Sequence, residues 1–138
     1  MTDPADQLPA IIDPPRPGAL TPLPDGNLIP TLIADAGDQA AWRYIDYFTS
    51  NIRNPNTRRA YARACGQFFV WCETRGRTLG TIRPIDVSTY IELRQQTHSA
   101  PDVKQQLAAV RMLFNWLIIG QVLPHNPAAA VRGPKRVV

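Results

Sequence analysis

Proline is distributed along this chain in a way that restricts where regular structure can form. Eight of the fourteen prolines lie within residues 1–30. Because proline lacks a backbone N–H donor and fixes φ, it is excluded from helix interiors and central strands. The later prolines that stand at or near the start of a helix-like segment are Pro55, Pro84, Pro101 and Pro127. The pattern predicts an extended leader followed by helices.

Apolar residues at helical spacing support this assignment. We expect helices over about Ala36–Ile52, Pro55–Arg75, Pro84–Thr97 and Pro101–Ile119, and a short last helix ending near Val131. The expected N-terminal caps are Asp35, Asn54, Ser99 and Asn126, and the expected C-terminal stops are Gly76 and Gly120. The sequence contains no alternating strand pattern. The expected fold class is all-α, a compact bundle of four main helices plus a short C-terminal helix.

The same features divide the chain into three parts. We expect residues 1–33 to form a disordered, proline-rich acidic leader, residues 34–132 one helical domain, and residues 133–138 the start of a linker. A domain of roughly 100 residues can bury a core without disulfides or metals. Cys65 and Cys72 fall on one face of the same expected helix, so we interpret them as reduced core thiols.

Charge is as unevenly distributed as proline. Residues 1–50 contain two basic and seven acidic side chains, a net charge of −5, whereas residues 51–138 contain thirteen basic and four acidic ones, a net charge of +9. A basic domain beside an acidic tail is typical of a module that binds a polyanion. Solvated surface charge without any partner is the alternative explanation at this point.

Two of the expected helices carry basic side chains away from their apolar faces. In the first, Arg59 and Arg63 project about 180° from the apolar face, which consists of Tyr61, Cys65, Phe68 and Cys72. Gly66 lies on the same outer side, where a small residue would allow close approach of a phosphate backbone or of another helix. In the second, a polar stripe lies about 110° from the apolar seam. The stripe is Lys104, Ala108, Arg111 and Asn115, and the seam is Val103, Leu107, Val110, Phe114 and Leu117. Lysine and arginine neutralise phosphates, and arginine and asparagine also read base edges.

The sequence offers no constellation of residues for catalysis. It has no glycine-rich phosphate loop and no paired carboxylates, and His98 and His125 have neither ligand spacing nor a nucleophile at a recognisable distance. No run approaches the ~18 apolar residues of a membrane helix, and the N-terminus does not resemble a signal peptide. We therefore expect no catalytic residue, cofactor, metal site, small-molecule substrate or membrane partner, and a cytoplasmic location.

Several motifs, in this order and spacing, resemble one known family. They are Asn56-Thr57-Arg58-Arg59-Ala60-Tyr61 with Phe68, Trp71 and Gly76; Ile82-Arg83-Pro84-Ile85-Asp86-Val87; Leu107 to Leu117; and Asn126-Pro127-Ala128 with Pro134-Lys135. Over about residues 36–136 the chain is similar to the N-terminal core-binding, or SAM-like, domain of tyrosine recombinases. It looks closest to bacterial Xer-type and phage-integrase recombinases.

The resemblance implies half of a C-shaped clamp around duplex DNA, with the helices over Pro55–Arg75 and Pro101–Ile119 at the major groove. The expected partners are a recombination site and other recombinase protomers, in a bacterial or phage-derived protein. The expected DNA-binding set is Thr57, Arg58, Arg59, Arg63, Lys104, Gln105, Ala108, Arg111, Asn115, Lys135 and Arg136.

In this family the cutting of strands belongs to a following domain with a tyrosine nucleophile, arginines and a His-x-x-Arg motif. Neither histidine makes that motif, because Pro101 follows His98 and Ala128 follows His125 three positions later. We therefore expect this chain to lack the catalytic domain and not to be an enzyme by itself.

Two other functional classes stay open at this point. The first is a helical protein–protein interaction module without intrinsic DNA affinity. The second is a repressor-like helix-turn-helix protein, which is disfavoured because the two basic helices are long and no short helix pair with a tight turn is present.

Overall fold

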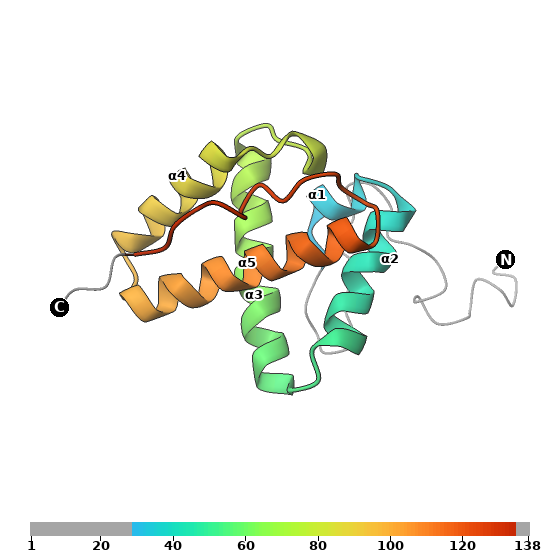
Figure 1. The fold of residues 1–138 in the computed structure, drawn as a ribbon, viewed down its shortest axis with the longest axis horizontal. Helices are drawn as coiled ribbons and strands as arrows, with labels where there is room; N and C mark the ends of the chain where they lie inside the picture. Colours follow the sequence, from blue (N-terminus) through green and yellow to red (C-terminus); the bar gives the residue numbers. More distant parts are fainter. Residues whose placement is uncertain (1–28, 135–138) are drawn as a thin grey trace, which may run out of the picture.

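A computed structural model describes residues 29–134, and its regular elements are all helical (Figure 1). They are α1 (Thr31–Ala34), α2 (Asp38–Asp46), a π-helix (Tyr47–Asn51), α3 (Pro55–Thr74), a 3₁₀ turn (Leu79–Thr81), α4 (Pro84–Gln95) and α5 (Ala100–Ile119). The expected all-α class is confirmed for the part of the chain that the structure describes. Most of the expected leader lies outside the described residues.

The two longest helices, α3 and α5, form the centre of the fold. Figure 1 shows α5 crossing in front of α3 at a steep angle, with α4 toward one end of α5 and α2 toward the other. The crossing is close, since the Cys65 thiol in α3 donates a hydrogen bond of 3.6 Å to the carbonyl oxygen of Ala109 in α5. The first half of α3 extends past α5 on one side (Figure 1).

The core lies where the expected apolar faces of α3 and α5 meet. Phe68 contacts the rings of Phe69, Tyr90 and Phe114, with centroids 5.4, 5.2 and 6.2 Å away, and so connects α3 to both α4 and α5. Each fully buried phenylalanine stabilises the fold by about 1.5–3 kcal/mol relative to an exposed one. Both expected faces are buried, except that Tyr61 is only half-buried.

Three contacts, one per helical turn, join α3 to α4. The Gln67 amide oxygen accepts a hydrogen bond of 2.7 Å from Arg94. One turn further along α3, the Trp71 ring lies 5.3 Å from the Tyr90 ring. One turn beyond that, Arg75 pairs with Asp86 at 3.4 Å. Successive contacts therefore involve residues four apart on each helix, with residue numbers rising along α3 as they fall along α4.

Local sequence explains most of the helix ends. The Asn54 side chain accepts hydrogen bonds from the backbone N–H groups of Asn56 and Thr57 at 2.8 and 3.2 Å, which confirms it as the N-cap of α3. Ser99 caps α5 in the same way through Asp102 N–H. After α3, Gly76 has φ of 74°, a left-handed conformation that glycine adopts without steric cost.

The expected single helix over Ala36–Ile52 with Asp35 as its cap is wrong in detail. Pro30 begins the short helix α1, and Asp35 ends it. Gly37 then takes φ of 110° and stands at the N-cap of α2, because a residue with a Cβ rarely adopts that conformation. Beyond Asp46 the α-helix becomes a five-residue π-helix, which the apolar spacing did not indicate.

The two ends of the domain also differ from expectation. Ile29, Leu32 and Ile33 are buried in the core, so the packed part begins before residue 34. The expected short helix near residues 127–131 is a turn, although Asn126 does cap it by accepting from Ala128 N–H at 2.8 Å. Gly133 and Pro134 follow directly, and proline cannot continue a helix.

Candidate nucleic-acid interface

The basic side chains fall into two groups, those held by the protein itself and those that face solvent. Arg43 belongs to the first group, since it donates to the Trp116 carbonyl oxygen at 3.0 Å and lies over the Trp116 ring. Arg94 donates to the Tyr90 hydroxyl at 2.8 Å as well as to Gln67. Arginines engaged in this way have structural roles and offer fewer free N–H donors to a partner.

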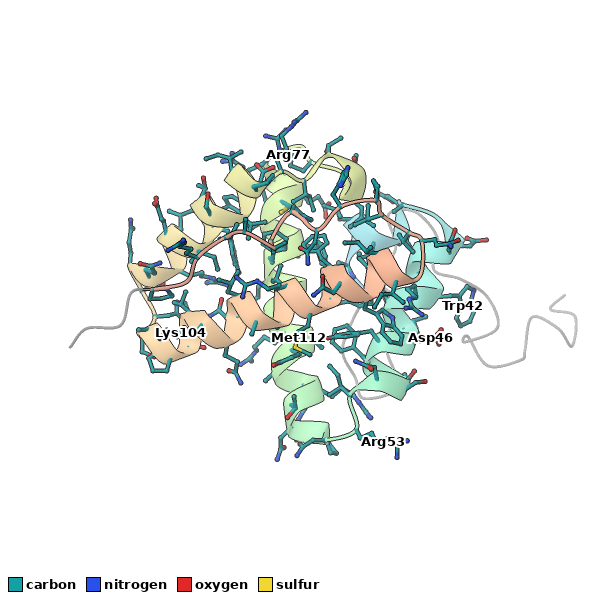
Figure 2. The ribbon with its side chains drawn as sticks, viewed as in Figure 1. Trp42, Asp46, Arg53, Arg77, Lys104 and Met112 are labelled. Atoms are coloured by element: carbon teal, nitrogen blue, oxygen red, sulfur yellow. The ribbon has the colours of Figure 1, made fainter. Side chains whose placement is uncertain are left out.

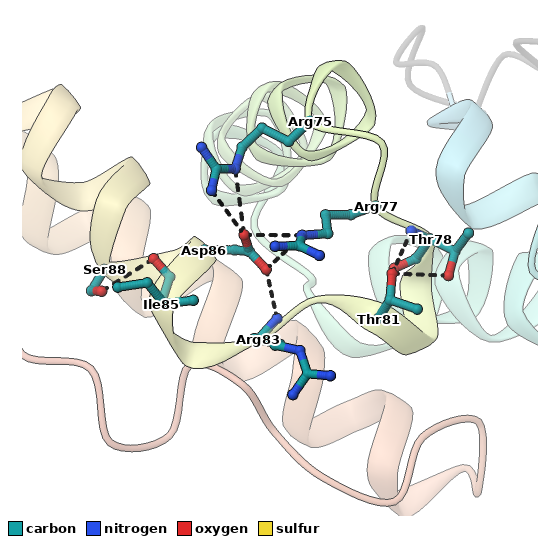
Figure 3. A network of polar contacts seen from close by, with 8 residues as sticks. All are labelled: Arg75, Arg77, Thr78, Thr81, Arg83, Ile85, Asp86 and Ser88. Carbon is teal, nitrogen blue, oxygen red and sulfur yellow. Dashed lines mark hydrogen bonds and ion pairs between the residues drawn. The ribbon is translucent and has the colours of Figure 1, made fainter.

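A buried carboxylate pairs with two further arginines (Figure 3). The Asp86 side chain is fully buried and forms ion pairs with Arg75 at 3.4 Å and Arg77 at 3.1 Å. Its second oxygen accepts a 2.8 Å hydrogen bond from the Arg83 backbone N–H at the start of α4. Burial opposes ionisation, but the Arg83 N–H and the two guanidiniums outweigh it, so the pKa of Asp86 lies below its ordinary value. The carboxylate therefore fixes the end of α3 against the start of α4.

Arg58, an expected DNA contact, is turned back onto its own domain. Its guanidinium donates two hydrogen bonds, of 3.1 and 2.9 Å, to the carbonyl oxygen of Ile52. Ile52 follows the π-helix directly, at the start of the connection to α3, and is itself buried. The contact closes that connection and orients α3.

Three arginines at the N-terminal end of α3 are exposed and have no acidic partner among the described residues. We call Arg53, Arg59 and Arg63 the α3 cluster. Arg59 donates to the Asn56 side-chain oxygen, and Figure 2 shows Arg53 beside the start of α3, at the end that extends past α5. Within residues 29–134, ion pairs form only between Asp86 and its two arginines and between His98 and Asp102. The α3 cluster thus carries uncompensated positive charge, the condition that favours an anionic partner.

The other expected α3 positions surround this cluster. Thr57 is half-buried, and its backbone N–H is used by the Asn54 cap. At Gly66 an added Cβ would meet no atom within 4 Å, so the surface beside Arg63 is open. Sequence reasoning missed Arg53, whose only signal was its position directly before the cap residue of α3.

The polar stripe of α5 lies against another part of the chain. We call residues 126–134 the exit segment, which runs back along α5 (Figure 1). Arg111 donates to the carbonyl oxygens of Ala128, at 3.2 Å, and of Val131. The Asn126 side-chain amide donates to the Arg111 carbonyl oxygen at 3.1 Å and to the Asn115 side-chain oxygen at 2.8 Å.

The exit segment also packs against the first turns of α5. A Cβ placed on Gly133 would lie 3.5 Å from a Leu107 methyl carbon and 3.7 Å from Cγ of Lys104. Ala108 is half-buried, whereas Lys104 and Gln105 are exposed. Within residues 29–134 no hydrogen bond or ion pair engages the ammonium group of Lys104, which lies near the start of α5 (Figure 2). Two more expected contacts, Lys135 and Arg136, lie outside the described residues.

The potentially reactive side chains of this region are packed in the core. Burial raises the pKa of Cys72 to about 12 and raises that of Cys65 above its ordinary value. Burial also raises the pKa of the Tyr47 hydroxyl. No group of three or more histidine, cysteine, aspartate or glutamate residues is placed to hold a metal ion in residues 29–134. None of the helices described is long and apolar enough to cross a membrane.

Sequence comparison relates this chain to a known protein family. The family model described as phage integrase, N-terminal SAM-like domain, matches residues 42–120. The chain belongs to this family. The match runs from within α2 to just past the end of α5, so the matched residues include the α3 cluster and the α5 stripe but not the exit segment.

A full-length relative places the family in context. The chain is 28% identical over 102 residues to a protein named tyrosine recombinase XerC from Pseudomonas fluorescens. The match covers 67% of this chain and 33% of the relative, so the chain spans about one third of that protein's length. No solved structure matches the chain. The expected membership of the tyrosine recombinase family, through its N-terminal domain, is confirmed.

Proposed function

We propose that this chain binds duplex DNA, with the α3 cluster and Lys104 as its main contacts, and that it serves site-specific DNA integration or recombination together with other recombinase protomers. The observation that carries the proposal is the group of exposed arginines at the projecting end of α3, which lack acidic partners in residues 29–134. Membership of the phage integrase family supports the same substrate.

The proposal modifies the set of contacts expected from sequence. Arg59, Arg63, Lys104 and Gln105 keep the assignment, since all four are exposed. Arg53 joins them because it is exposed beside the start of α3. Arg58 and Arg111 are assigned to holding the backbone instead, because their guanidiniums already bind carbonyl oxygens.

Phosphate contacts of this kind predict weak, salt-dependent binding. A non-specific interaction typically has a Kd of ~10⁻⁴–10⁻⁶ M at physiological salt, and each neutralised phosphate contributes about −0.9 to the slope of log K against log salt. Alanine or glutamine at one contact should therefore reduce the slope by about one and weaken all DNA sequences similarly.

The experiment compares two exposed arginines, Arg63 within α3 and Arg83 at the start of α4. Arg63→Gln should reduce duplex affinity and the salt slope. Arg83→Gln removes the same charge at the start of α4 and should change neither. Circular dichroism controls for folding. Equal losses for the two variants would mean that overall charge, not the α3 cluster, governs binding. No duplex binding by the parent at low salt would favour the protein-interaction module.

A further inference from the structure

The exit segment is held against α5 by contacts of several kinds. After α5 the chain turns at Gln121, which has φ of 62°, and returns beside the helix (Figure 1). Pro127, Ala128 and Val131 are buried, so the segment contributes apolar surface to the domain. Its polar anchors are the Asn126 side chain at one end and the Arg111 guanidinium further along. The path of residues 126–134 is thereby fixed.

We propose that Arg111 is a positioning residue that latches the exit segment onto α5, and that the latch places Arg132 beside Lys104 to form a second phosphate-binding patch. The phosphate part of this inference rests on the proposed function. The patch is distinct from the α3 cluster and uses a residue, Arg132, from outside the region that the family model matches.

The chemistry of Arg111 suits a latch. Two of its N–H groups reach two carbonyl oxygens three residues apart, those of Ala128 and Val131. Arginine presents its donors in a rigid planar fork, whereas lysine has a compact ammonium that cannot span two acceptors in the same way. Hydrogen bonds from a charged donor are also stronger than neutral ones. Lysine at this position would keep the charge and lose the paired geometry.

The position and charge of the second patch follow from where the exit segment packs on α5. Gly133 lies against the aliphatic part of the Lys104 side chain. The preceding residue, Arg132, is therefore brought to the first turns of α5. Both side chains are exposed, and within residues 29–134 neither forms an ion pair. The nearest acid along the helix, Asp102, is half-buried and lies 4.0 Å from His98. Two uncompensated cations would thus face solvent side by side.

The first test measures the latch alone, by backbone hydrogen exchange on the 138-residue chain. In Arg111→Lys the N–H groups of Ala129 and Val131, which bond within the exit segment, should exchange about tenfold faster or more. Exchange at the α3–α5 crossing should not change. Asn126→Ala removes the other polar anchor and should produce the same local loss of protection. Unchanged exchange of the exit segment in both variants would overturn the latch.

The second test asks whether the latch acts through Arg132. Arg132→Ala in the parent should lower the duplex-binding salt slope by about one. In the Arg111→Lys background the same change should have little further effect, because Arg132 is already displaced. Arg63→Gln is the control and should cost the same in both backgrounds. Equal effects of Arg132→Ala in the two backgrounds would refute the positioning role.

The two tests separate this inference from the proposed function. If the parent does not bind duplex DNA, the proposed function and the phosphate role of the patch both fail, while hydrogen exchange still decides on the latch. If Arg63→Gln weakens binding but Arg132→Ala does not, the proposed function stands and the second patch is refuted.

Discussion

Replacing Asp86 with asparagine would remove one charge from the most buried polar network of the domain. Asparagine keeps the size of the side chain and an oxygen for the Arg83 N–H, but it can no longer form ion pairs with Arg75 and Arg77. Breaking a fully buried ion pair costs about 3–5 kcal/mol. Here the two arginine side chains are 38% and 32% exposed, so water can hydrate them after the change. We therefore expect a loss of about 2 kcal/mol, within the range for hydrogen bonds to charged groups.

Urea denaturation followed by circular dichroism measures this loss. At pH 7 the unfolding midpoint of Asp86→Asn should fall by about 1 M, given a typical dependence on urea of about 1–3 kcal/mol per M. Glu92→Gln is the matched control, because Glu92 is exposed on the same helix and forms no ion pair within residues 29–134. The control should unfold at the parent midpoint. A variant Asp86→Asn with the parent midpoint would refute the stabilising role of the carboxylate.

The pH dependence gives an independent check with a defined sign. The folded-state pKa of Asp86 is depressed, so its stabilisation is fully present above the unfolded value, about 3.9, and is lost as the pH falls through the folded-state pKa. The stability gap between the parent and Asp86→Asn should therefore be constant from pH 7 to about 5 and shrink at lower pH. A gap that persists undiminished at the lowest pH where both proteins fold would contradict the assigned cause.

Three further changes test the helix assignments and the core. Gly66→Ala should stabilise the protein by about 0.5–1 kcal/mol through helix propensity, since the added methyl meets open space; a lower thermal midpoint would argue against a regular helix there. Asn54→Ala should cost about 1 kcal/mol because two capping hydrogen bonds disappear, with Asn54→Ser as the conservative control; equal urea midpoints for all three proteins would exclude the cap. Burial raises the pKa of the Cys65 thiol, so a thiol reagent at pH 8 should label the chain only as fast as it unfolds; rapid labelling of the native protein would show an accessible site.

The helix starts were predictable because each depends on residues close together in sequence. Asn54 and Ser99 cap α3 and α5 through groups only two or three positions away. The apolar faces of these helices were predictable for a similar reason, since helical periodicity alone decides which side is buried. The change to a π-helix at Tyr47 was not predictable, because the apolar spacing of Ile45, Phe48 and Ile52 continues through it and marks no change of hydrogen-bond pattern.

The candidate interface was predictable only in part, and the exit segment shows why. Spacing along α5 gives the direction of Arg111 relative to its own helix, and that direction is away from the apolar seam. It cannot reveal that a segment fifteen or more positions later returns to cover that side. Arg58 escaped prediction similarly, because its partner is a backbone carbonyl oxygen, which sequence does not mark. The exposure of cations such as Arg63 was predictable, since no other described segment covers that side of α3.

The three contacts between α3 and α4 have a consequence for how these helices can slide past each other. Each of these contacts joins a different chemical pair: an amide with a guanidinium at Gln67, two rings at Trp71, and a guanidinium with a carboxylate at Arg75. A shift of one turn, about 5.4 Å, in either direction would take the buried Asp86 carboxylate away from Arg75. Separating a buried charge from its partner is strongly destabilising. The helix pair therefore accepts one alignment and excludes its nearest competitors, which a uniform row of leucines would not do.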